Sequence, residues 1–168
     1  MIAVMGIGAL LLGAQTGPFP ALPQIDLSEF PPVVREQVAK AYNAARANPK
    51  DAEANGELGM LLDVYKRRDF AAACYERAHQ LDSKSFRWLY YLGSLRAEQG
   101  DREGATAAFR AALRLRPDYL PARLKLAESL LTSGDLREAG ALYEAIIKDN
   151  PRVAEAHYGL GRIRTAKG

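Results

Sequence analysis

From Val33 onward, apolar residues recur at the spacing that places them on one face of a helix. The first such stretch, residues 33–47, brings Val34 and Val38 onto a common face. Asn48-Pro49 follows it, and a proline cannot continue a helix. The pattern therefore predicts a first helix that ends at about residue 48.

Beyond this helix the pattern itself repeats with a period of 34 residues. The equivalent positions are Leu58-Gly59, Leu92-Gly93, Leu126-Ala127 and Leu160-Gly161, then Ala71, Ala105 and Ala139, then Tyr75, Phe109 and Tyr143, and finally Pro49, Ser83, Pro117 and Pro151. Gly100-Asp101 and Gly134-Asp135 lie midway through two units, where glycine can turn the chain and aspartate can begin a helix. Each unit is therefore predicted to be two helices joined by a short turn.

A period of 34 with Leu-Gly, then Ala-x₃-Phe/Tyr-x₂-Ala, then Pro resembles the tetratricopeptide repeat family, over about residues 33 to 168. The resemblance implies an all-α fold, an α-solenoid of antiparallel helix pairs. It implies an N-terminal capping helix at 33–48 and a repeat array at 52–168. The expected units are 52–85, 86–119, 120–153 and a partial repeat at 154–168.

In such an array each helix pair buries its apolar face only against its neighbours. We expect the small residues Gly59, Gly93 and Ala127 to let the second helix approach closely, at Ala71, Ala105 and Ala139.

The chain departs from the family pattern at three places. Lys66-Arg67 stands where Gly-Asp is usual, so this turn is expected to be distorted; Arg96 replaces an aromatic residue; and Trp88 lies one residue before the family's Trp position.

The N-terminal region has a different composition. Residues 1–14 are apolar throughout, too short to span a bilayer, and match the central region of a secretory signal. The interpretation is export to the periplasm or beyond the cell; the alternative is a buried or disordered tail on a cytoplasmic protein. Residues 15–32 contain five prolines and are expected to be an extended linker. Deletion of residues 1–30, which removes the apolar segment and most of this linker, is therefore expected to leave stability unchanged.

The net charge and the cysteine and histidine residues limit the classes of function that the chain could have. The 23 basic and 20 acidic residues leave a net charge of +3, with both signs interspersed, so no basic stripe for nucleic acid is evident. Cys74, His79 and His157 fit no metal-ligand or catalytic spacing. We therefore expect no metal, no cofactor and no enzymatic activity, and we interpret Cys74 as a buried thiol.

In the family that the chain resembles, the first helix of each repeat lines a concave groove. A stripe along these helices, with its edges, supplies the candidate partner-binding residues, because Tyr and Arg dominate binding energy at interfaces. They are Met60, Arg87, Tyr90, Tyr91, Ser94, Leu124, Lys125, Glu128, Tyr158 and Arg162. Trp88 is expected to pack between repeats instead. Gly56, Met60 and Tyr91 stand where the family's clamp for acidic chaperone tails has Lys and Asn, so that function is excluded.

The leading hypothesis is thus a scaffold that binds a protein or peptide segment in the groove, with no stable membrane span and no nucleic-acid partner. The alternative is a structural or assembly module of a longer exported protein, and a helical-repeat RNA binder is a third. Residues 154–168 fit either a closing helix or the first half of a further repeat. The identity of the partner and the oligomeric state are not indicated.

Overall fold

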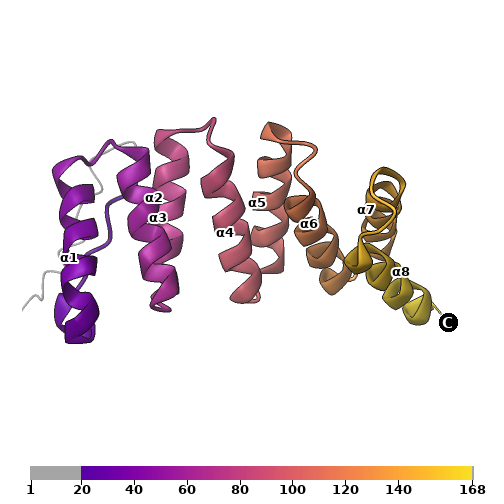
Figure 1. Cartoon of the computed structure of the whole chain (residues 1–168), viewed down its shortest axis with the longest axis horizontal. Coiled ribbons are helices and arrows are strands. Elements are labelled where there is room, and N and C mark those ends of the chain that lie inside the picture. Colours follow the sequence, from indigo (N-terminus) through magenta and orange to yellow (C-terminus); the bar gives the residue numbers. More distant parts are fainter. Residues whose placement is uncertain (1–19, 168) are drawn as a thin grey trace, which may run out of the picture.

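The computed structural model describes residues 20–167. They form a short 3₁₀ helix, η1 (Leu27–Glu29), and the α-helices α1 (Pro32–Ala47), α2 (Ala52–Val64), α3 (Arg68–Leu81), α4 (Phe86–Glu98), α5 (Arg102–Leu115), α6 (Leu120–Ser133), α7 (Leu136–Asp149) and α8 (Ala154–Lys167). Figure 1 shows the helices side by side in chain order, from α1 at one end to α8 at the other. The expected all-α solenoid is confirmed, because residues 20–167 contain no strand and successive helices pack on each other.

The segment 1–14, on which the expectation of export depends, lies outside the described residues, as do residues 15–19 of the expected linker. Among the helices that are described, none is both long and apolar enough to cross a membrane.

Capping aspartates begin three of the α-helices. The side chain of Asp51 accepts hydrogen bonds from the backbone amides of Glu53 and Ala54, and Asp101 and Asp135 each cap the following helix in the same way. Each bond satisfies an amide that the first turn of a helix leaves without an internal partner. The starts of α2, α5 and α7 are therefore encoded locally.

The turn within each helix pair has one geometry throughout. Gly100 and Gly134 adopt left-handed backbone angles, with φ of 81° and 88°, and Lys66 at the equivalent position has φ of 59°. The amide of the next residue donates to a carbonyl five positions earlier in all three turns, at 2.8–2.9 Å. The expected distortion at Lys66 is therefore wrong: the same hydrogen bonds form, and the lysine takes up a backbone conformation that favours glycine.

Within a helix pair, a glycine of the first helix lies against an aromatic ring of the second. A Cβ added to Gly59 would lie 2.9 Å from the ring of Tyr75, and one added to Gly93 would lie 2.8 Å from the ring of Phe109. From the sequence, we expect the second helix to approach these glycines at its alanines, whereas the atoms nearest to each added Cβ belong to the aromatic ring. The ring is the nearest neighbour, while Ala71 is fully buried nearby.

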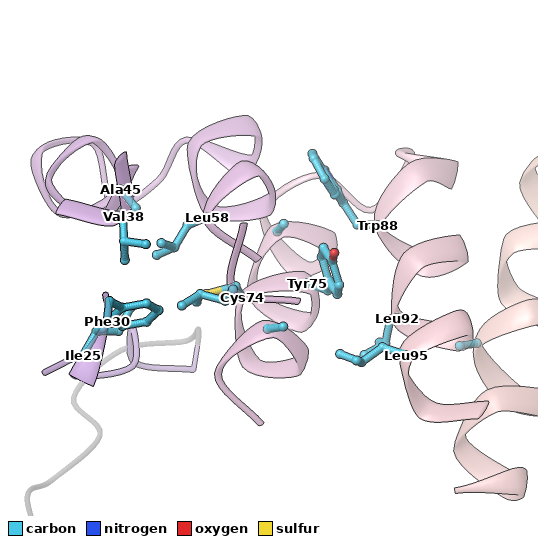
Figure 2. Packing of buried hydrophobic residues seen from close by; sticks show 14 residues of the cluster. Ile25, Phe30, Val38, Ala45, Leu58, Cys74, Tyr75, Trp88, Leu92 and Leu95 are labelled. Carbon is cyan, nitrogen blue, oxygen red and sulfur yellow. The ribbon is translucent and has the colours of Figure 1, made fainter. Parts of the chain in front are cut away.

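The segment before α1 packs against the array and is not a separate linker over residues 20–31. Ile25 and Phe30 are 9% and 3% exposed and belong to the same buried cluster as Val38, Leu58 and Cys74. Figure 2 shows Phe30 and Ile25 close to Val38 and Cys74. The prolines explain the expectation of a linker, but Ile25 and Phe30 between them are buried against the array, and burial of apolar surface favours the packed segment.

A buried arginine attaches this segment to the first repeat. Arg77 is 8% exposed, and its Nε donates to Oδ1 of the fully buried Asn55 at 2.8 Å. Its Nη2 donates to the carbonyl of Pro49 at 2.7 Å, and its Nη1 donates to the carbonyl of Pro20. One guanidinium thus joins the N-terminal segment, the α1–α2 turn and α2, and these bonds offset the cost of burying its charge.

Candidate peptide-binding groove

A groove of about 680 Å³ opens between α6 and α8. Its lining combines apolar, aromatic and charged side chains. They are Leu120, Pro121, Leu124, Lys125, Glu128, Tyr143, Val153, Glu155, Tyr158 and Arg162. The volume lies within the range of sites that bind ligands. Tyr158 is 70% exposed, which is unusual for so large a side chain and leaves it available to a partner.

An ion pair joins the two helices along the groove. Nη1 of Arg162 donates to both carboxylate oxygens of Glu128, at 2.7 and 2.9 Å. The hydroxyl of Tyr143 also donates to Glu128, at 3.1 Å. The hydrogen bond and charge of Glu128 raise the pKa of Arg162. Burial and the adjacent Glu128 raise the pKa of Tyr143. Both residues therefore keep their protons, and the ion pair links α6 to α8.

Tyr143 reaches the groove from α7 because α8 has a glycine beside it. A Cβ added to Gly159 would lie 2.3 Å from the Tyr143 ring. The ring is 2% exposed, so it forms part of the buried base of the groove. Gly159 therefore determines how closely α8 approaches α7.

Five of the ten predicted groove residues line this site: Leu124, Lys125, Glu128, Tyr158 and Arg162. Three others form a second group on α2 and α4. The guanidinium of Arg87 lies 3.1 Å from Sδ of Met60, pairs with Glu53, and lies 5.9 Å from the centre of the Tyr91 ring. The structure thus divides the predicted surface into two parts.

Tyr90 and Ser94, the remaining two, face a different environment. The Tyr90 ring lies 5.7 Å from that of Phe86, 5.4 Å from Tyr119 and 6.2 Å from Phe109, centre to centre. Burial raises the pKa of the Tyr90 hydroxyl, and Tyr119 adds to this effect. Tyr90 is half-buried within an aromatic cluster between repeats, and Ser94 is half-buried on the same helix.

Trp88 is 1% exposed, and its ring covers Gly56, where a Cβ would lie 2.3 Å away. The expectation that Trp88 packs between repeats is confirmed. The guanidinium of Arg87 lies 4.5 Å above the Trp88 ring. In the α2–α4 part of the surface, the charge of Arg87 is therefore already engaged by Glu53 and by the Trp88 ring.

The ten predicted groove residues leave out the other half of the lining, which consists of Leu120, Pro121, Tyr143, Val153 and Glu155. Pro121 and Glu155 belong to the same periodic stripe as the predicted residues, so the pattern contains them, whereas it gives no signal for Leu120 and Val153. Tyr143 is a repeated aromatic position in the sequence, and only the three-dimensional structure shows that its ring lies against Gly159 and that its hydroxyl donates to Glu128. No group of three or more potential metal ligands occurs in the part of the chain that the structure describes.

Known proteins with similar sequences or structures share this helical-repeat architecture. Two family models, both described as tetratricopeptide repeat, match residues 65–119 and 96–163. A crystal structure of MamA superposes with a TM-score of 0.74, at 22% identity, over 87% of each chain. The structure of YrrB, described as a TPR protein with an unusual peptide-binding site, superposes with a TM-score of 0.73, at 21% identity, over 80% of this chain and 70% of that one.

Two further proteins are similar to parts of this chain. The first repeat domain of Spaghetti (RPAP3), bound to the HSP90 peptide SRMEEVD, superposes with a TM-score of 0.64, at 22% identity, over 69% of this chain and 92% of that one. Cellulose synthase operon protein C of Pseudomonas fluorescens (strain SBW25) is 36% identical over 67 residues, which are 40% of this chain and 5% of that protein. The chain therefore matches only a small part of this relative's length.

Proposed function

The chain belongs to the tetratricopeptide repeat family, and on that premise we propose that it is an interaction scaffold that holds a protein or peptide segment against the concave groove between α6 and α8. The observation that carries the proposal is the groove itself. It combines apolar walls, an exposed tyrosine and charged groups of both signs, which is the composition of surfaces that bind protein segments.

The relatives support the same class of function. The Spaghetti repeat domain holds a peptide in its solved structure, and YrrB is described by its peptide-binding site. At 21–22% identity these structures share the fold with this chain, and the peptide they bind need not be shared. The scaffold function is the common feature.

A selection from a displayed library of random peptides tests this function. We expect peptides to be enriched on the folded protein. Tyr158→Ala should weaken their binding by about tenfold, because exposed tyrosines at a groove contribute strongly to interface energy. Val33→Ala is the matched control, since Val33 is 92% exposed on the distant helix α1. Failure to enrich any peptide, or equal binding by the Tyr158 variant, would contradict the assignment.

A second candidate, an assembly module that stacks on a further helix, is supported by Gly161. This residue is equivalent to Gly59 and Gly93, which contact the rings of Tyr75 and Phe109, yet a Cβ on Gly161 would meet nothing within 4 Å. A following helix could place a ring there. A library selection that enriches no peptide would favour this second function over the first.

We further propose that the protein is exported and that the scaffold acts in the periplasm or outside the cell. Its support is the apolar composition of residues 1–14. Whether the chain remains in the cytoplasm can be decided by fractionating cells that express it.

A further inference from the structure

We propose that the groove between α6 and α8 selects a segment in which one large apolar side chain is flanked by an acidic residue on one side and a basic residue on the other. This inference rests on the proposed function, because it specifies the chemistry of the segment that the scaffold would hold. The selectivity depends on which charged residues of the groove already form an ion pair and which do not.

The apolar part of the site comes from the N-terminal ends of the two helices. Leu120, Pro121 and Leu124 belong to α6, and Val153 immediately precedes α8. Tyr158 extends beside them and is 70% exposed. A leucine or aromatic side chain of a partner would lose its hydration against these groups, which is the main source of binding free energy at such sites.

The four charged residues of the groove differ in what they already bind. Both carboxylate oxygens of Glu128 are engaged, by Arg162 and by the Tyr143 hydroxyl. This pair is neutral as a unit and offers a partner little net charge. By contrast, Lys125 and Glu155 make no ion pair with any residue between 20 and 167.

Lys125 and Glu155 lie on different walls of the groove. Lys125 belongs to α6 and Glu155 to the first turn of α8, and both are exposed. A partner segment that fills the apolar part would therefore meet a positive charge on one wall and a negative charge on the other. Opposite charges on the segment satisfy both, whereas a wholly acidic tail would be attracted by Lys125 and repelled by Glu155.

The α2–α4 part of the predicted surface differs in the state of its charged groups. Arg87 is already paired with Glu53 and lies on the Trp88 ring, and Trp88 covers Gly56. The α2–α4 part therefore presents charges that are already compensated, and the selectivity is assigned to the α6–α8 groove.

The experiment uses the full chain and a displayed library of random peptides. For the unmodified protein, enriched peptides should carry one acidic and one basic residue around an apolar residue. Lys125→Glu should shift the enriched pool to peptides with two basic residues, and Glu155→Lys should shift it to peptides with two acidic residues. A peptide selected on the unmodified protein should bind either variant about fivefold more weakly, because an exposed attraction becomes a repulsion.

The matched controls are Arg114→Glu on α5 and Glu144→Lys on α7, which change the net charge equally at exposed residues outside the groove. Both controls should select the same peptides as the unmodified protein. Circular dichroism verifies that all four variants remain helical. Suppose that the enriched peptides need Tyr158 for binding but carry the same charges on the Lys125 and Glu155 variants as on the unmodified protein. This inference is then overturned, and the scaffold function stands. If no peptide is enriched, the scaffold function itself fails.

Discussion

At the scale of single residues, the first repeat shows how the array tolerates a departure from its own pattern. Lys66 occupies the left-handed position that Gly100 and Gly134 occupy in the next two repeats. Its neighbour Arg67 replaces the capping aspartate, but it pairs with Glu29 and its guanidinium lies 5.6 Å from the ring of Phe30. The substitution thus removes a helix cap and adds a connection to the N-terminal segment.

This arrangement predicts that Lys66→Gly stabilises the protein. Left-handed angles cost a residue with a Cβ about 1 kcal/mol or more, and glycine avoids most of that cost. Glycine also has more conformational freedom in the unfolded chain, which offsets part of this gain, so we expect the free energy of unfolding in urea to rise by about 0.5 kcal/mol. Gly134→Ala is the matched control and should lower it by a similar amount, because a Cβ there meets nothing within 4 Å and only the backbone angle is unfavourable. Equal stability of the unmodified protein and the Lys66→Gly variant would contradict this account.

At the scale of elements, the N-terminal segment behaves as part of the first layer of the array. Phe30 contacts Tyr65 edge-on, with ring centres 6.2 Å apart, and lies in the same cluster as residues of α1, α2 and α3. Arg35 of α1 donates from Nε to the carbonyl of Leu27 at 3.1 Å, which ties the segment to that helix. Together the segment and α1 cover the apolar side of α2 and α3, which an array would otherwise expose.

The structure therefore reverses the expectation that removing residues 1–30 leaves stability unchanged. Phe30→Ala should lower the free energy of unfolding by about 3 kcal/mol, because it empties a buried ring site. Removal of residues 1–30 should destabilise the protein at least as much. The control is Val33→Ala, at a side chain that is 92% exposed, where the change should be below about 0.5 kcal/mol. Thermal melting that is identical for the Phe30 and Val33 variants would show that the segment does not contribute to the core.

At the scale of the whole molecule, buried ionisable groups make the array sensitive to alkaline pH. Burial raises the pKa of Cys74 from 9.0 to about 12. Burial likewise raises the pKa of Tyr75 and Tyr143 above their ordinary value of 10.0. These groups lie in two buried clusters that between them extend from the N-terminal segment to α8. Their ionisation is therefore linked to the folding of the entire array.

We predict that stability is fully present below pH 9 and falls above it. In that range the unfolded chain releases the Cys74 proton and the folded chain retains it, so the free energy of unfolding decreases as pH rises. The loss should be about 1 kcal/mol per pH unit for each group concerned. Melting temperatures measured across this range provide the test. Cys74→Ala should remove the part of the decline that begins at pH 9 and leave the tyrosine part. A melting temperature independent of pH would contradict the prediction.

The sequence alone determined the helical repeat, because its signals are local and recur. Each unit carries its own small residue, its aromatic residue and its turn, as at Gly93, Phe109 and Gly100. Helix starts at Asp101 and Asp135 depend on bonds to amides only three residues away. Packing in an array involves mainly neighbouring units, so a pattern with a fixed period specifies most of the fold.

Only the tertiary structure decided which residues meet across that pattern. The prolines of residues 20–31 favour an extended chain, but whether it remains separate depends on Arg77, which lies 57 positions beyond Pro20. The groove stripe is periodic in sequence, yet on α2 and α4 the Arg87 side chain is paired with Glu53 and lies over the buried Trp88 ring, whereas on α6 and α8 a groove is open. Periodicity specifies which face a side chain occupies. The volumes and charges of side chains from different helices decide whether that face is filled or left available to a partner.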